Sequence, residues 1–138
     1  MKTVFITGGT GFLGGALIKN LSENGIKIKA LVRNPQKGEK IAHLAGVELI
    51  QGDLTTDTAW MNNALAGVDV VFHVAAALGG DMAEQTAINV DATRALALAS
   101  AKAGIGRFVH VSSIAVYGYP YEPLITEDAP LTKPIPYI

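Results

Sequence analysis

The strongest chemical signal in this chain is a cluster of glycines close to its first residue. The spacing Gly9-x-Gly11-x-x-Gly14 matches a turn that binds a dinucleotide, and Gly8 stands directly before it. A main chain without Cβ atoms can turn tightly and approach a diphosphate closely. A helix that begins at such a turn also directs its unpaired N–H groups, and the positive end of its dipole, at the anion.

The segments on both sides of the glycines decide between this interpretation and a glycine-rich turn that binds nothing. Residues 4–6 are apolar, which predicts a short buried strand. After the glycines, apolar residues recur at helical spacing: Phe12, Leu13, Ala16, Leu17 and Leu21. The order of strand, glycine turn and helix favours nucleotide binding over an empty turn.

A second candidate feature is the cation that follows the next strand. Residues 26–32 alternate in polarity like a strand. An acid at its end would accept a hydrogen bond from a ribose 2′-hydroxyl and suit NAD. The position carries Arg33 instead, with Lys37 and Lys40 close behind. Because a guanidinium can bind a 2′-phosphate with two hydrogen bonds, NADP(H) is the preferred cofactor and NAD(H) the alternative. The competing interpretation of Arg33 is a solvated loop charge.

Composition excludes several classes of protein. With 138 residues, of which 49% are hydrophobic and 17% charged, the chain suits one buried core and is too apolar for a disordered protein. A net charge of −1 without a basic block argues against nucleic acid as a partner. The absence of cysteine rules out disulfides and thiolate metal sites, and we predict no metal site. We expect a small-molecule substrate.

A membrane segment is also not expected. The longest apolar run outside the glycine region, residues 68–80, is too short to span a bilayer and contains Asp69 and His73. The glycines and threonines near the N-terminus spoil the apolar stretch that a signal peptide needs. We therefore predict a soluble, cytoplasmic protein with no membrane association.

The remaining periodicities predict an α/β fold. Apolar runs predict further strands at residues 47–51, 68–74 and 107–111, and helical patterns lie between them at 35–44, 55–65 and 83–103. Strands that alternate with helices indicate a doubly wound parallel sheet, the Rossmann fold, with five strands in the order 3-2-1-4-5. We predict a single dinucleotide-binding domain over residues 1–138, in which residues 119–138 form a proline-rich loop.

The motif at residues 7–14, TGGTGFLG, resembles the signature turn of the extended short-chain dehydrogenases/reductases. Three further segments resemble motifs of that family: Gly52-Asp53-Leu54, residues 73–76 and residues 89–93. In the last of these, Ala92 stands where the family usually has a glycine. The resemblance implies an NAD(P)-dependent oxidoreductase acting on a ketone or alcohol carbon. Two alternatives stay open: an NAD-dependent sugar-nucleotide epimerase or dehydratase, and a non-catalytic module that senses NADP.

Together with Arg33, the resemblance implies the cofactor-binding residues. In that frame Asp53 lies beside the adenine, although it could equally cap the next turn. Asn89 faces the active site, and His73 is positional rather than a catalytic base. The predicted cofactor-binding set is Gly8, Gly9, Thr10, Gly11, Phe12, Leu13, Gly14, Arg33, Asp53, Leu54, Val74, Ala75, Ala76, Asn89, Val111 and Ser112.

The resemblance also implies the catalytic residues. Aligned on Tyr117-Gly118, the second serine of the preceding pair, Ser113, is the catalytic one, and Tyr137 is the proton donor or acceptor. A local turn role for the serines is the alternative. The family's lysine would fall at position 141, beyond Ile138, so the chain is expected to be a truncated cofactor-binding half that lacks this lysine and is inactive by itself. A homodimer through the helix at 83–103 is a further expectation.

Overall fold

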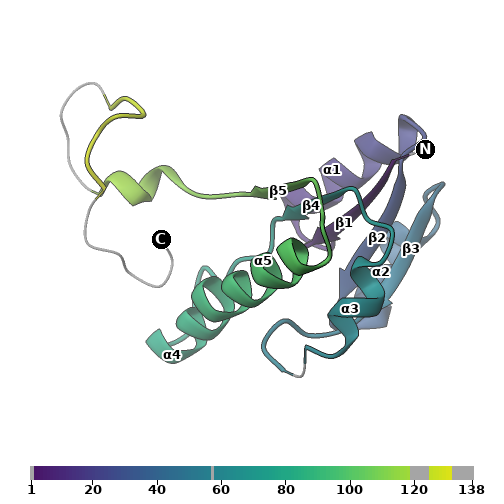
Figure 1. The fold of residues 1–138 in the computed structure, drawn as a ribbon, viewed down its shortest axis with the longest axis horizontal. Helices are drawn as coiled ribbons and strands as arrows, with labels where there is room; N and C mark the ends of the chain where they lie inside the picture. The colour runs from purple at the N-terminus through teal and green to yellow at the C-terminus, as the bar shows by residue number, and fades with distance from the viewer. Residues whose placement is uncertain (1, 57, 119–124, 132–138) are drawn as a thin grey trace.

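The computed structural model describes residues 2–56, 58–118 and 125–131. Five parallel strands form one sheet in the order β3-β2-β1-β4-β5 (Figure 1). They are β1 (Thr3–Thr7), β2 (Lys27–Val32), β3 (Val47–Gln51), β4 (Val70–His73) and β5 (Arg107–His110). The predicted fold class and strand order are therefore confirmed.

Helices cover both faces of this sheet because side chains alternate along each strand. On β1, Val4 and Ile6 point into a core shared with Ile18 of α1 (Phe12–Glu23) and Ile41 of α2 (Pro35–Ala42). Phe5 points to the opposite face, into a second core with Met61 of α3 (Trp60–Leu65) and Leu96 of α5 (Ala92–Lys102). The two cores pack on both faces of the sheet and so position the carboxyl ends of the strands at one edge.

The predicted boundaries hold within a few residues except at α3. The sequence predicts a helix from residue 55, but α3 begins at Trp60. The reason is local: the Asp53 carboxylate accepts hydrogen bonds from the main-chain N–H and the hydroxyl of Thr55, and this turn competes with a helical start.

The helix predicted at 83–103 is present, but its middle is wound differently. It runs through α4 (Met82–Gln85), a π-helical turn η1 (Thr86–Asp91) and α5. A capping box explains its start, since the Asp81 carboxylate accepts from the Glu84 N–H while the Glu84 carboxylate accepts from the Asp81 N–H. Turns of this kind occur often at functional sites, and this one lies beside the pocket described below.

After β5 the chain leaves the sheet. The short 3-10 helix η2 (Ile114–Tyr117) follows and lies away from the strands (Figure 1). Ser113 caps it: the Ser113 hydroxyl accepts from the Ala115 N–H at 3.2 Å. The predicted loop at 119–138 falls mostly outside the described residues, and the assignment of the whole chain to one domain stays a prediction.

Candidate nucleotide-binding site

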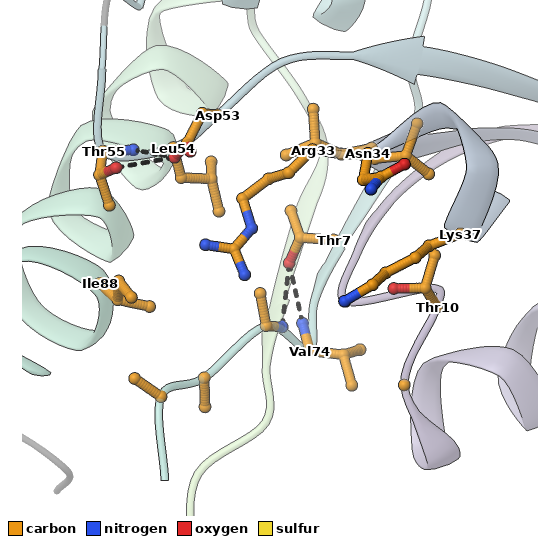
Figure 2. A pocket seen from close by; sticks show the side chains of 17 residues that line it. Thr7, Thr10, Arg33, Asn34, Lys37, Asp53, Leu54, Thr55, Val74 and Ile88 are labelled. Atoms are coloured by element: carbon orange, nitrogen blue, oxygen red, sulfur yellow. Dashed lines mark hydrogen bonds between the residues drawn. The ribbon is translucent and has the colours of Figure 1, made fainter. Parts of the chain in front are cut away.

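A pocket of about 620 Å³ lies at the carboxyl ends of β1, β2 and β4 (Figure 2). This is the switch point of the sheet, because β2 lies on one side of β1 and β4 on the other. Ligands of open parallel sheets bind at such points, and the volume falls within the range of small-molecule sites. The pocket joins segments that are far apart in the sequence: the glycine turn, the residues after β2, residues 53–55 after β3, residues 74–77 after β4, and Ile88 of η1.

The glycine turn presents main-chain N–H groups to one end of the pocket. Gly11 occupies the cap position of α1 with an extended backbone, and no side chain caps the helix there. The first N–H groups of α1 therefore lack the partners that a capping side chain would supply. The Phe12 side chain is 99% exposed, so it does not cover this end of the helix. The arrangement suits a diphosphate.

Two of the glycines are required by close approaches of the main chain. Gly8 has φ +70°, and a Cβ there would lie 2.7 Å from the main-chain nitrogen of Ala75. At Gly14, a Cβ would overlap the carbonyl oxygen of Gly8, so α1 packs directly on the turn. By contrast, a Cβ at Gly15 would meet its nearest atom, the Gly9 carbonyl oxygen, at an ordinary 3.5 Å.

Two cations also line the pocket. The side chains of Arg33 and Lys37 both point into it, Arg33 from the end of β2 and Lys37 from α2 (Figure 2). Asn34 lies between them and caps α2 by accepting from the Gln36 N–H at 2.9 Å. Lys40 bonds to the Thr10 carbonyl oxygen and so ties α2 to the glycine turn. This side of the pocket is therefore suited to an anion that two cations can share.

Asp53 lines the same pocket and is held as a carboxylate. Partial burial raises its pKa, but the hydrogen bonds from the Thr55 N–H and hydroxyl, together with the Arg33 charge, outweigh burial and leave the pKa below its usual value. The turn role predicted as one alternative for Asp53 is thus present. Because the carboxylate also faces the pocket, it can accept a further hydrogen bond from a ligand.

Residues 74–77 form the floor of the pocket and are held from two directions. The Thr7 hydroxyl oxygen accepts from the N–H groups of Val74 and Ala75, both at 3.1 Å (Figure 2). The Asn89 side chain bonds both the N–H and the carbonyl of Ala77, at 2.7 and 2.9 Å. Asn89 therefore fixes the end of the floor rather than lining the pocket itself.

His73 lies under this floor, 1% exposed, and contacts two threonine hydroxyls, those of Thr7 and Thr93. These partners support the positional role expected for it. Burial, followed by the charge of nearby His110, lowers the pKa of His73 from 6.5 to about 4.

The lowered pKa of His73 makes stability depend on pH. Between pH 6.5 and 4 the unfolded chain binds a proton that the folded chain does not, so the free energy of unfolding falls as the pH decreases. We expect a loss of about 2 kcal/mol from this group between pH 7 and pH 5. Urea unfolding at both values should show a smaller decrease for His73→Gln than for the natural protein. Equal decreases in the two proteins would contradict the assignment.

The structure brings together more than half of the predicted cofactor-binding residues. Those that line the pocket are Gly8, Thr10, Gly11, Arg33, Asp53, Leu54, Val74, Ala75 and Ala76. Gly9 and Gly14 shape the turn from behind. Phe12, Leu13, Asn89, Val111 and Ser112 do not line the pocket. Ser113 does not line it either, and its hydroxyl makes the local turn contact named above. Tyr137 lies outside the described residues.

Sequence reasoning missed several residues of the site. Thr7 is the most important, because its hydroxyl organises the floor of the pocket and only its place at the end of β1 hints at this. Ile88 lines the pocket from η1, where a regular helix was expected. Asn34, Thr55 and Ala77 also line it, each directly beside or within two residues of a predicted residue.

A parallel sheet with a glycine turn and a pocket at its switch point is typical of dinucleotide-binding domains. Comparison with known families agrees: residues 4–138 match the NAD dependent epimerase/dehydratase family. The chain belongs to this family, whose members are extended short-chain dehydrogenases/reductases, so the resemblance stated from the sequence is confirmed.

Its curated relatives include enzymes of ketone and sterol chemistry. It is 39% identical over 118 residues to the 4-hydroxy-2-methyl-3-oxo-4-farnesyl-3,4-dihydroquinoline-1-oxide ketoreductase of Stigmatella aurantiaca, covering 84% of this chain and 34% of the relative. Sterol demethylase protein B of Methylococcus capsulatus is 37% identical over 119 residues, with 84% and 36% covered. The chain thus spans about a third of the length of the curated relatives it matches.

Among solved structures, the WbmG enzyme of Bordetella bronchiseptica in complex with NAD and UDP is similar, with a TM-score of 0.85 and 32% identity over 97% of this chain and 44% of that one.

Within the described part of the chain, we find no helix with the length and apolar character needed to cross a bilayer. Nor do the described residues include three grouped side chains suited to hold a metal ion.

Proposed function

We propose that this chain is the cofactor-binding part of an NADP(H)-linked oxidoreductase that acts on a ketone or alcohol carbon. The observation that carries the proposal is the pocket itself, which combines the open N-terminus of α1 with the side chains of Arg33 and Lys37. A dinucleotide phosphate carries anions at just two such places, its diphosphate and its 2′-phosphate. Curated relatives that reduce ketones support the choice of reaction.

The residues of the pocket fit such a cofactor by their chemistry. The N–H groups at the start of α1 would bind the diphosphate, and Arg33 and Lys37 would bind the 2′-phosphate. The Asp53 carboxylate, beside buried Leu54, would accept a hydrogen bond from the adenine amino group. The small side chains of residues 74–77 leave room along the floor for the rest of the dinucleotide.

The catalytic part of the proposal rests on family membership. The bound nicotinamide would supply or accept a hydride. Ser113 would donate a hydrogen bond to the substrate oxygen, and Tyr137 would exchange a proton with that oxygen. For Ser113 this requires its hydroxyl, which now accepts from the Ala115 N–H, to direct its hydrogen at the substrate; an oxygen can accept one bond and donate another.

Removal of the Ser113 hydroxyl provides a test. In an active enzyme that contains this chain, we expect Ser113→Ala to lower kcat/KM with a ketone substrate by about 100-fold, because the substrate oxygen loses a hydrogen bond that strengthens in the transition state. The Kd for NADPH should stay within about twofold, since the side chain lies outside the pocket. A steady-state assay of NADPH oxidation with a panel of ketones measures kcat/KM. Fluorescence titration measures the Kd for NADPH. Unchanged kcat/KM would contradict the role.

A second candidate is an NAD-dependent sugar-nucleotide epimerase. The similarity to WbmG with NAD and UDP favours it, whereas Arg33 in the pocket favours the reductase. Turnover of a UDP-sugar without net consumption of NADPH would identify an epimerase. Binding of NADP(H) without turnover of either substrate class, by residues 1–138 and also by a longer chain that carries the lysine, would instead identify the sensing module considered from the sequence.

Two further expectations extend the proposal. A homodimer through residues 83–103 would cover Leu98, whose side chain is 65% exposed on α5. In that case Leu98→Lys should convert a dimer to a monomer in sedimentation experiments, and a natural protein that sediments as a monomer would exclude it. A cytoplasmic location is tested by cell fractionation.

A further inference from the structure

The buried side chain of His73 connects two threonines that are far apart in the sequence. Its Nδ1 lies 2.7 Å from the hydroxyl oxygen of Thr7, which stands at the end of β1. Its Nε2 lies 2.8 Å from the hydroxyl oxygen of Thr93, in the first turn of α5. The hydrogen bonds Thr93–His73–Thr7 therefore connect α5, under the pocket, to the central strand β1.

The single hydroxyl hydrogen of Thr7 determines which atom donates and which accepts in each of these hydrogen bonds. The Thr7 oxygen already accepts from the N–H groups of Val74 and Ala75, and a hydroxyl oxygen has two lone pairs. Its one hydrogen is left to be donated to His73, so Nδ1 must be an acceptor. The ring is then neutral, carries its hydrogen on Nε2, and donates it to the Thr93 oxygen.

We propose that His73 is a positioning residue of the nucleotide site: as the neutral ring protonated on Nε2, it holds the Thr7 hydroxyl in the orientation that binds the main chain of Val74 and Ala75. The consequence for a ligand rests on the function proposed above, since Val74 and Ala75 line the pocket. The role lies outside the proposed catalytic machinery, because His73 does not line the pocket and its ring nitrogens bond to Thr7 and Thr93.

A proton on Nδ1 would break this arrangement. Nδ1–H would compete with two main-chain N–H groups for the two lone pairs of the Thr7 oxygen, so one of the three bonds would be lost. The titratable group that faces His73 is His110 on β5, with ring centroids 5.5 Å apart, while Phe108 of the same strand and the two threonines are uncharged. A second imidazolium at that distance opposes the proton further, in keeping with the lowered pKa of His73.

The direct test is the tautomer of His73 in the natural protein. Ring nitrogen and carbon chemical shifts from NMR at pH 7 distinguish the form protonated on Nε2 from the form protonated on Nδ1. We expect the Nε2–H form to dominate. A dominant Nδ1–H form would overturn the proposal, whether or not the protein binds a nucleotide.

Variants of Thr93 test the consequence for binding. Thr93→Val removes the acceptor for Nε2–H at nearly constant shape, so the amide resonances of Val74 and Ala75 should move and the Kd for NADPH should rise about fivefold to tenfold. Thr93→Ser keeps a hydroxyl and should restore both. The matched control is Thr86→Val: the Thr86 hydroxyl bonds the Met82 carbonyl on the same helical segment, and its loss should change neither.

The outcomes separate this proposal from the proposed function. Amide shifts and Kd that stay unchanged in Thr93→Val would overturn the positioning role even if NADPH binds. If the natural protein binds no nucleotide, the proposed function fails, while the tautomer and the amide shifts still decide the role of His73.

Discussion

Gly14→Ala should abolish binding of NADPH, whereas Gly15→Ala, one residue further along the same helix, should leave it intact. At Gly14 the new Cβ would overlap the Gly8 carbonyl oxygen, so either the glycine turn or α1 must move, and the N–H groups that face the diphosphate move with it. We expect the Kd to rise at least about 100-fold, measured by fluorescence titration, because the main-chain bonds to the diphosphate depend on this geometry.

Gly15 provides the matched control for the same chemical change. Its Cβ would lie 3.5 Å from the nearest heavy atom outside the helix, an ordinary contact. Since alanine is favoured over glycine inside a helix, Gly15→Ala should raise the free energy of unfolding by about 0.5–1 kcal/mol. Circular dichroism melts show whether both variants are folded. Equal nucleotide affinity in two folded variants would contradict the role given to the turn.

Arg33→Ala should change the choice of cofactor rather than binding as a whole. Arg33 points into the pocket and its side chain is exposed, so its truncation to alanine should not disturb the packing of the fold. If its guanidinium binds the 2′-phosphate, we expect the Kd for NADPH to rise about 30-fold, because a charge-assisted bidentate contact is lost. The Kd for NADH, which lacks this phosphate, should stay within about threefold.

Two control variants test whether the effect of Arg33→Ala on the Kd for NADPH comes from the guanidinium. Arg33→Lys keeps the charge but loses the planar pair of donors, so its Kd for NADPH should lie between those of the natural protein and Arg33→Ala. Arg107→Ala removes another exposed arginine, at the start of β5 and outside the pocket, and should affect the Kd of neither cofactor. Equal weakening of NADPH and NADH by Arg33→Ala would show that Arg33 does not read the 2′-phosphate.

Features that depend on neighbours in the sequence could be predicted. The glycine spacing, the apolar run of β4 and the alternation in β2 each reflect a local geometric requirement, and the structure has the strands and their order where these patterns put them. The Asp81-x-x-Glu84 capping box was also readable, yet the helix was expected to begin at residue 83, one residue after its observed start at Met82.

Features that depend on contacts across the fold could not be predicted in the same way. The bond between Thr7 and His73 spans 66 positions of sequence, so no local pattern announces it. The π-helical turn at Thr86–Asp91 has no composition of its own, and the bonds that accompany it, from Asn89 to Ala77, join residues 12 positions apart. The sequence therefore predicted many of the residues that line the pocket, whereas it missed Thr7, which organises the floor, and Ile88, which lines the pocket from the π-helical turn.

The most direct test of this account is an amide NMR titration of the protein with NADP⁺. If the turn between β1 and α1 binds the diphosphate through its main chain, the N–H resonances of Phe12 and Leu13 should show the largest shifts, with saturation at the same Kd as those of Val74 and Ala75. Unmoved resonances in the turn, at concentrations where the rest of the protein responds, would contradict it.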